Sequence, residues 1–296
     1  MPIKQRKAFL TGVNAYPNAP LQGCVNDVLD VANALVRYGW QESDIHLLLD
    51  ARVTKDNWIE RMDWLIDTSP NDTILYWGSG HGAQIATRNP QQELDGLDEI
   101  SCLVNFNWDD ISGTAIRDKE FAEYIAKIPA GVNAIIGSDT CNSGGLMRSM
   151  LGNHNPIIRP RHFPEPPDIA WRNEAARRMG FAPRGLLSLI MSFWELLFGA
   201  KSNSITPDLE NTTDAPIAYI SGCKSNQTSA DTTIGGHPCG AMTHYFWSEI
   251  VNSLDKPFQD VVAAARNELS RQHYSQEPQA EGSKINQTVR LLLGLG

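Results

Sequence analysis

The 296-residue sequence is poor in cysteine, and its five cysteines form no recognisable pairs. They are scattered and never spaced as C-x-x-C, so the sequence contains neither a zinc-knuckle pattern nor a disulfide framework. Unpaired thiols are typical of a reducing compartment. The apolar run at residues 8–10 is too short for a signal peptide. We therefore expect a cytoplasmic protein.

Positive charge is also scarce, because 25 Lys and Arg face 34 Asp and Glu and give a net charge of −9. A general nucleic-acid-binding protein needs clustered basic side chains, so we expect no nucleic-acid partner.

Long apolar runs are missing too. The most apolar segment, residues 186–198, is shorter than the roughly 20 residues of a transmembrane helix. We expect it to pack against the domain, with a partner- or membrane-facing helix as the alternative; membrane contact is not expected overall.

Strand-like and helix-like segments alternate over the first 140 residues. The predicted strands are 7–13, 44–49, 73–77, 100–104 and 132–137, and the predicted helices are 25–38, 55–68 (capped by Thr54) and 118–127. Regular structure resumes with a strand at 217–221, helices at 242–254 and 258–272, and a closing strand at 289–293. Because such nearly all-apolar strands are buried on both faces, the sequence predicts an α/β fold with a mostly parallel sheet.

Residues 147–214 interrupt this pattern. Frequent prolines forbid regular structure over much of the segment, apart from a helix predicted near 168–179. Its seven arginines make it the most basic part of an acidic chain. We interpret it as a long exposed linker or insertion, called the connector below. The predicted organisation is a first block, 1–146, with the reactive motifs described next, then the connector, and a second block, 215–296, that completes the same domain.

Two predicted strands end in reactive side chains, His81 after the third strand and Cys141 after the fifth. In a parallel sheet both loops should face one crevice beyond the carboxyl ends of the strands. There an imidazole can take the proton of a thiol, the thiolate can attack a carbonyl, and backbone N–H groups can hold the oxyanion. Spacing alone leaves a structural role open for both residues. Trp77 breaks the G-x-S-x-G elbow around Ser79, which disfavours a serine esterase.

Several motifs resemble those of caspase-like peptidases, and among these the metacaspases and the prokaryotic orthocaspases. S-G-H-G at 79–82 and D-T-C-N-S-G-G at 139–145 resemble their paired histidine and cysteine motifs. Further similar segments follow in the family's order: G-C-V-N-D at 23–27, D-G-L-D-E at 95–99, and small-subunit-like segments at 220–231 and 240–243. The resemblance implies a caspase-like three-layer sandwich, with a mostly parallel, roughly six-stranded sheet and helices on both faces.

The resemblance implies a cysteine endopeptidase with a catalytic dyad of His81 and Cys141. The amides of Gly82 and Cys141 would form the oxyanion hole. A substrate pocket would be lined by Asp27 and Asp139, with Ser79 beside them. Two carboxylates favour an arginine or lysine side chain, so the expected partners are proteins or peptides with Arg or Lys before the cut. The simpler interpretations are a helix cap for Asp27 and a turn residue for Asp139.

The chemistry requires no cofactor, but the resemblance makes calcium a candidate activator. The family's site is a cluster of aspartates in the loops after the histidine-bearing strand, here Asp95, Asp98, Glu99, Asp109 and Asp110. Carboxylate oxygens suit calcium. The chain departs from the family in having no acid near residues 147–148, and in carrying Asn142 where a histidine usually follows the nucleophile. Ordinary surface carboxylates are the alternative to a calcium site.

The connector contains arginines that the expected peptidase could cut itself. Self-processing and an uncut insertion that covers the cleft are both compatible with the sequence. The candidate sites are Arg159, Arg161, Arg172, Arg177, Arg178 and Arg184. Two other functions remain as alternatives: a catalytically silent caspase-fold scaffold, and a related peptidase that cuts after Asn or Asp.

Overall fold

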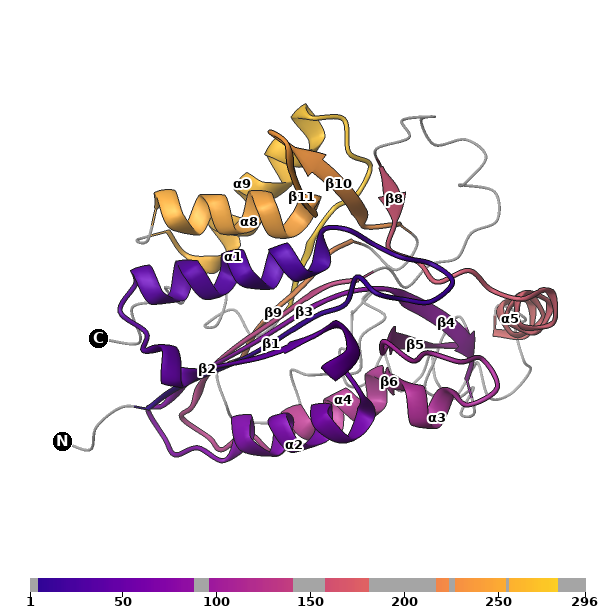
Figure 1. Cartoon of the computed structure of the whole chain (residues 1–296), viewed down its shortest axis with the longest axis horizontal. Helices are drawn as coiled ribbons and strands as arrows, with labels where there is room; N and C mark the ends of the chain where they lie inside the picture. The colour runs from indigo at the N-terminus through magenta and orange to yellow at the C-terminus, as the bar shows by residue number, and fades with distance from the viewer. Residues whose placement is uncertain are drawn as a thin grey trace, which may run out of the picture.

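The computed structural model describes residues 5–87, 96–140, 158–180, 217–223, 227–253 and 256–281. Its centre is a six-stranded sheet in the order β12-β9-β7-β3-β1-β2 (Figure 1). The strands are β1 (Arg6–Gly12), β2 (Ile45–Leu49), β3 (Thr73–Ser79), β7 (Asn133–Asp139), β9 (Ile217–Ser221) and β12 (Gln279–Glu281). Neighbours run parallel except β12, which is antiparallel to β9. The predicted α/β fold with a mostly parallel sheet is confirmed.

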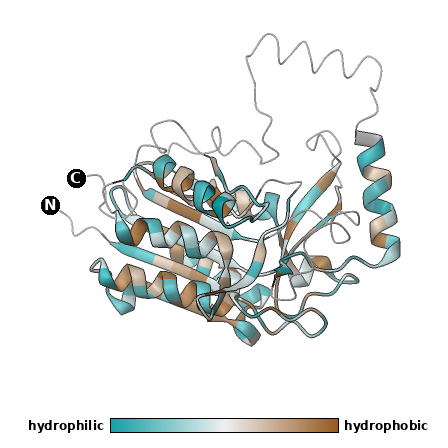
Figure 2. Cartoon of the chain, turned by 90° about the horizontal axis from the view of Figure 1, so that it is seen from above, coloured by the Kyte–Doolittle hydropathy of each residue, from teal (hydrophilic) through white to brown (hydrophobic). Residues whose placement is uncertain are grey.

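Helices cover both faces of this sheet because its strands are apolar on both sides. All seven residues of β3 are buried, and successive side chains point to opposite faces. On one face, Leu75 and Trp77 pack with α1, α8 and α9; on the other, Ile74 and Tyr76 pack with α2 and α4. Their bounds are α1 (Cys24–Arg37), α2 (Lys55–Ile66), α4 (Asp118–Ile125), α8 (Ala241–Asn252) and α9 (Phe258–Arg271). Figure 2 shows the hydrophobic strands enclosed between more hydrophilic helices.

Local signals set the helix boundaries. The Thr54 side chain accepts a hydrogen bond from the Asn57 N–H and caps α2, as predicted. After α1 the chain turns at Gly39, whose φ of +80° favours glycine. These helices lie within a few residues of their predicted bounds. The closing strand predicted at 289–293 and the apolar segment 186–198 lie outside the described residues.

Two small antiparallel sheets flank the main one. One contains β4 (Gly82–Ala86), β5 (Leu97–Cys102) and β6 (Ala115–Arg117), with α3 (Ile111–Thr114) before β6. The other contains β8 (Arg159–Pro160), β10 (Ala230–Ile234) and β11 (His237–Gly240). Two short 3₁₀ turns, η1 (Glu42–Asp44) and η2 (Asp50–Arg52), flank β2. The strand predicted at 100–104 is therefore part of an antiparallel sheet beside the site, where β4 pairs with it.

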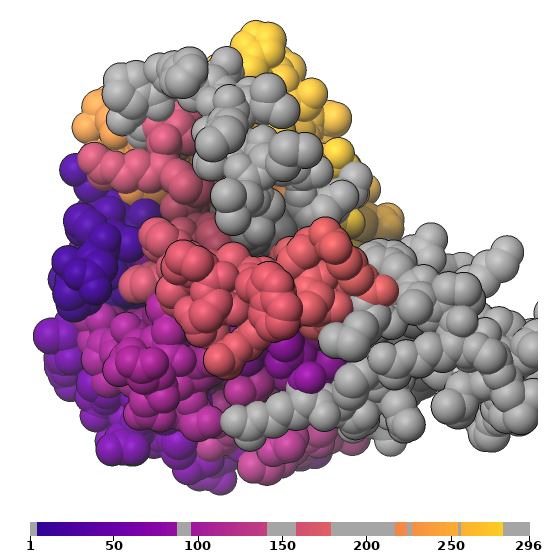
Figure 3. All heavy atoms as spheres, turned by 90° about the vertical axis from the view of Figure 1, so that its right-hand side faces the viewer, coloured from indigo at the N-terminus to yellow at the C-terminus, as the bar shows by residue number. Residues whose placement is uncertain are grey.

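The prediction of an exposed linker is wrong for the segment around Arg161 and Phe163, which is buried, whereas several residues of the following helix are exposed. The predicted helix is present as α5 (Pro167–Gly180), but the segment before it enters the domain. There β8 pairs with β10, and Arg161 is completely buried. Figure 3 shows residues 158–180 lying across the side of the molecule that is on the right in Figure 1. None of the described helices is long and apolar enough to cross a membrane.

Candidate active site

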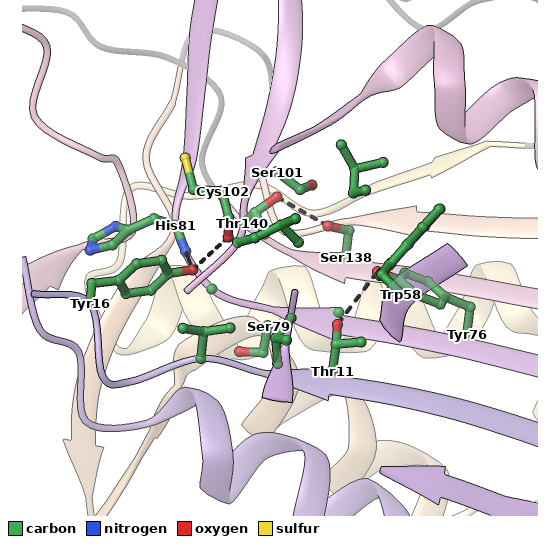
Figure 4. Close-up of a pocket in the computed structure, with 16 residues that line it drawn as sticks. Thr11, Tyr16, Trp58, Tyr76, Ser79, His81, Ser101, Cys102, Ser138 and Thr140 are labelled. Atoms are coloured by element: carbon green, nitrogen blue, oxygen red, sulfur yellow. Dashed lines mark hydrogen bonds between the residues drawn. The ribbon is translucent and has the colours of Figure 1, made fainter. Parts of the chain in front are cut away.

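The carboxyl ends of three adjacent strands form the floor of the site. Gly12 on β1 aligns with Ser79 on β3, which aligns with Asp139 on β7. The register therefore places the ends of these strands at one level, and the loops that leave them share one cavity. His81, Ser79, Cys102 and Thr140 all line this cavity (Figure 4).

The ring of His81 is held in one orientation. Its Nε2 lies 2.7 Å from the carbonyl oxygen of Ala19, and because a carbonyl only accepts, Nε2 carries the proton. Its backbone N–H donates to the Tyr16 hydroxyl at 2.9 Å, and that hydroxyl donates to the Cys102 carbonyl at 2.9 Å. The tyrosine ring also lies against the imidazole, with centroids 4.7 Å apart. Nδ1 is thus left as the free, basic nitrogen.

The His81 imidazole is kept neutral by its surroundings. Burial lowers its pKa to about 4, although the hydrogen bond with the Ala19 carbonyl opposes the shift. Within the described part of the chain, Nδ1 is buried and has no hydrogen-bond partner. A neutral imidazole with an unshared lone pair is able to take a proton from a neighbouring group.

Cys141 lies outside the described residues, so its distance from His81 stays a prediction. The residue before it, Thr140, is buried and lines the same cavity as His81. Its hydroxyl lies 3.0 Å from that of Ser138 on β7. The described chain therefore leads from β7 to the cavity in which a nucleophile would meet the imidazole.

A second cysteine lies beside the same cavity. Cys102 donates its backbone N–H to the His81 carbonyl at 2.9 Å, and its side chain is buried. Burial raises the pKa of the Cys102 thiol well above its ordinary value, which opposes formation of a thiolate. Burial likewise raises the pKa of Cys239 to about 12. These thiols suit packing better than nucleophilic chemistry.

The predicted pocket residues lie together, and the structure adds a third carboxylate. Asp27 and Asp139 are joined by Asp231 on β10, which sequence reasoning did not select; all three side chains are at most 2% exposed. Ser79 donates to Asp27 at 2.7 Å. A signal for Asp231 was present, because it ends the small-subunit-like segment 220–231.

Backbone and hydroxyl donors hold each carboxylate in place. Asp27 accepts the Gly240 N–H at 2.7 Å. Asp139 accepts both the N–H and the hydroxyl of Thr243, at 3.0 and 2.7 Å. Asp231 accepts the N–H groups of Gln22 and Gly23, at 2.9 and 2.8 Å. The three carboxylates are therefore held in fixed positions and converge on one point in the pocket.

The guanidinium of Arg161, from the chain's own connector, occupies that point. Its nitrogens lie 2.7 Å from Asp27 and 3.2 Å from both Asp139 and Asp231. It also donates to the Ser79 hydroxyl at 2.7 Å and to the Asp139 carbonyl at 3.1 Å. Burial raises the pKa of Asp27 to about 6, although the positive charge of Arg161 opposes the shift. One cation thus meets three buried anions.

The backbone around Arg161 is hydrogen-bonded to the residue before β10 on one side and to the start of β4 on the other, where His162 forms a parallel β-bridge with Gly82. Its N–H donates to the Ser229 carbonyl at 3.1 Å, and its carbonyl oxygen accepts the Gly82 N–H at 2.9 Å. Gly82 is the residue whose amide the sequence predicts in the oxyanion hole. The carbonyl that follows the buried arginine side chain therefore lies at that amide.

The described aspartates of the candidate calcium cluster either have other partners or are exposed. Asp98 pairs with Arg117 at 3.0 Å and with Lys119 at 2.5 Å. The Asp110 side chain caps α3 by accepting the Gly113 N–H at 3.1 Å, and Asp109 is exposed. Asp95 lies outside the described residues. In the part of the chain that the structure describes, no three His, Cys, Asp or Glu residues are grouped to hold a metal ion.

Known proteins resemble the chain in both sequence and fold. Residues 6–150 match the metacaspase, peptidase C14 domain. Metacaspase-1 of Kluyveromyces lactis is 30% identical over 98% of this chain and 69% of its own length, and Metacaspase-1 of Schizosaccharomyces pombe is 28% identical over 93% and 66%. The chain thus spans about two thirds of the length of these relatives.

A solved structure shares the fold. The crystal structure of protein GSU0716 from Geobacter sulfurreducens matches with a TM-score of 0.68 and 23% identity, over 99% of this chain and 100% of that one. Together with the relatives above, these similarities decide the classification. The chain belongs to the metacaspase family, peptidase C14, a family of cysteine peptidases.

Proposed function

We propose that this chain is a cysteine endopeptidase that cuts after arginine, and less readily after lysine, and that it cuts its own connector between Arg161 and His162. The observation that carries the proposal is the position of Arg161. Its side chain is buried among three carboxylates while its carbonyl oxygen accepts the Gly82 N–H. An arginine before a scissile bond has to satisfy both conditions at once.

Charge decides which side chain the pocket accepts. An aspartate would add a fourth negative charge to three buried ones, and an asparagine would leave them without a cation. Both disfavour the alternative of a peptidase that cuts after Asn or Asp. The guanidinium contacts Asp27, Asp139, Asp231 and Ser79 through two nitrogens. A lysine ammonium, with one nitrogen, cannot make all these contacts together, which supports arginine over lysine.

The proposed chemistry follows from the groups at the cavity. Nδ1 of His81 takes the proton of the Cys141 thiol, and the thiolate attacks the carbonyl carbon after the pocket arginine. The carbonyl oxygen gains the negative charge and is stabilised by the Gly82 N–H. Collapse breaks the C–N bond, and the imidazolium gives its proton to the leaving amine. Water then hydrolyses the thioester and regenerates the thiol.

The conformation of the connector favours Arg161 over the other candidate sites. Arg161 lies outside any helix and next to a parallel β-bridge between His162 and Gly82, so its carbonyl oxygen is able to accept the Gly82 N–H. Arg172, Arg177 and Arg178 lie within α5, whose backbone is already hydrogen-bonded internally. Arg159 lies on β8 and is only partly buried. Arg184 lies outside the described residues.

A full-length chain and its Cys141→Ala variant test the proposal directly. We expect wild type to yield two fragments whose masses place the cut between Arg161 and His162, and the variant to stay intact. Identical single bands would overturn self-processing. Reporter peptides ending in Arg, Lys, Asp and Asn, given to wild type and to Arg161→Gln, test the specificity. If neither protein releases the reporter from the Arg peptide, the peptidase proposal fails and the silent scaffold replaces it.

A further inference from the structure

We infer that the site also has an aromatic subsite, which accepts an aromatic or large aliphatic side chain two positions after the cut. The inference rests on the proposed function, because it takes Arg161 as the residue before the cut. In the intact chain the occupant of this subsite is Phe163. Its side chain is buried although it lies in the connector, with 7% of its surface exposed.

Four rings surround Phe163. Its centroid lies 4.8 Å from that of Phe106, 5.4 Å from His81, 5.8 Å from Tyr16 and 6.3 Å from Trp108. All four contacts are edge-to-face, the geometry that aromatic rings prefer. The side chain is therefore enclosed by a shaped apolar pocket.

The walls of the subsite come from the first block, residues 1–146, and not from the connector. Tyr16 and His81 follow β1 and β3, while Phe106 and Trp108 lie between β5 and α3. The walls contact one another as well, with 4.9 Å between the centroids of Phe106 and Trp108 and 4.7 Å between those of Tyr16 and His81. Because these contacts do not involve Phe163, the subsite does not depend on it for its shape.

Backbone hydrogen bonds fix the spacing between the two pockets. Gly82 donates to the Arg161 carbonyl and accepts the Phe163 N–H, both at 2.9 Å. These two bonds form a parallel β-bridge between Gly82 and His162, and the residues on either side of a bridged residue point to the same side, so the buried side chains of Arg161 and Phe163 both enter the domain. A peptide can bind with its arginine among the three carboxylates and its backbone paired with Gly82. The second residue after its cleaved bond then lies at the same four rings.

The next residue of the chain is also held. The Trp108 indole N–H donates to the Pro164 carbonyl at 3.1 Å. Trp108 thus contributes both an apolar wall and a hydrogen bond to the peptide backbone. The subsite selects by burial of apolar surface, and a full aromatic side chain is expected to raise kcat/KM on the order of 10- to 100-fold over alanine.

Internally quenched peptides with one arginine test the inference. They differ only at the second residue after the arginine, which is Phe, Leu, Ala or Asp. We expect full-length wild type to cut in the order Phe, Leu, Ala, Asp, with Phe over Ala by about 10- to 100-fold in kcat/KM. The connector competes equally with all four peptides, so it does not alter their ratios.

Trp108→Ala should reduce the ratio of Phe to Ala at least several-fold and leave the ratio of Arg to Lys before the cut unchanged. Trp64→Ala is the matched control, because that indole stacks on His46 and is not among the rings around Phe163. Phe163→Ala should slow self-processing and Phe163→Leu should restore much of it, while Trp171→Ala, an exposed aromatic on α5, should change nothing.

The outcomes separate the two proposals. If all four peptides are cut at equal rates, the aromatic subsite is overturned and cleavage after arginine stands. If the ratio of Phe to Ala survives in both Trp108→Ala and Phe106→Leu, the selectivity arises elsewhere and the inference is also overturned. If neither the quenched peptides nor a reporter joined directly to arginine is cut, the peptidase proposal itself fails.

Discussion

Asp231→Asn tests the third carboxylate of the arginine pocket with little change in shape. The side chain lies 3.2 Å from the Arg161 guanidinium and is 2% exposed. Truncating one partner of a buried charge pair costs about 2–5 kcal/mol. Here two other carboxylates keep contact with the cation, and removing one anion relieves repulsion between the three. We therefore expect the lower end, about 2 kcal/mol, which is roughly a 30-fold loss in kcat/KM.

The measurement requires a pocket that Arg161 does not occupy. In the chain with Arg161, Asp231→Asn would weaken the binding of Arg161 as much as that of the peptide's arginine, and the two effects would cancel. Arg161→Gln and the double variant Arg161→Gln/Asp231→Asn are compared with Arg- and Lys-ended reporter peptides. The loss should be mainly in KM, since the pocket binds the same charge before and during the reaction.

Asp30→Asn is the matched control, because that carboxylate lies on the surface of α1 beside His237. Melting temperatures show whether the loss of an acceptor for Gln22 or Gly23 weakens the fold. A folded Arg161→Gln/Asp231→Asn protein whose kcat/KM for the Arg peptide equals that of Arg161→Gln would refute the reasoning.

Three further predictions follow from the site. Burial raises the pKa of Asp27 to about 6 although the positive charge of Arg161 lowers it, so in the Arg161→Gln background the carboxylate should become protonated at a pH above that value, and kcat/KM for Arg peptides should fall as it is protonated. The pKa of His81 is lower, about 4, so the loss of activity at the higher pH is due to Asp27 and should disappear in Asp27→Asn. If Asp27→Asn still loses activity over that pH range, another group is responsible. Cys102→Ala should keep reporter cleavage and Cys141→Ala should abolish it, since burial holds the Cys102 thiol protonated; the reverse result would exchange their roles. Asp98 is already neutralised by two cations, so Asp98→Asn should leave any response of reporter cleavage to calcium and chelator unchanged, and a lost response would make it a ligand.

The main sheet and its helices were predictable because their sequence patterns are local. Each face of β3 and each buried stripe of α1 is determined by residues that follow one another in the chain. The short strands β8 and β12 were missed, since two or three residues carry no periodicity. They exist because β10 and β9 offer them free edges, which is a tertiary effect.

The site was predictable only in part, for a similar reason. His81 and the pocket residues Asp27 and Asp139 stand in motifs that can be recognised one at a time. The burial of Arg161 contradicts the ordinary exposure of arginine and makes sense only once three carboxylates converge from β7, β10 and α1. Phe163 gave no signal either, because its four aromatic neighbours come from three separate loops.

The excess of anions over cations in the arginine pocket affects what happens after a peptide bond is cut. Three carboxylates surround one guanidinium, so the occupied pocket already carries a negative surplus. An uncut arginine has a neutral carbonyl group next to it, whereas a cut one ends in a new carboxylate. Under the proposed function, hydrolysis would place a further anion within a side chain's length of the others, where like charges repel each other. Cleavage would then turn a well-held ligand into a poorly held one, which would favour product release and repeated turnover.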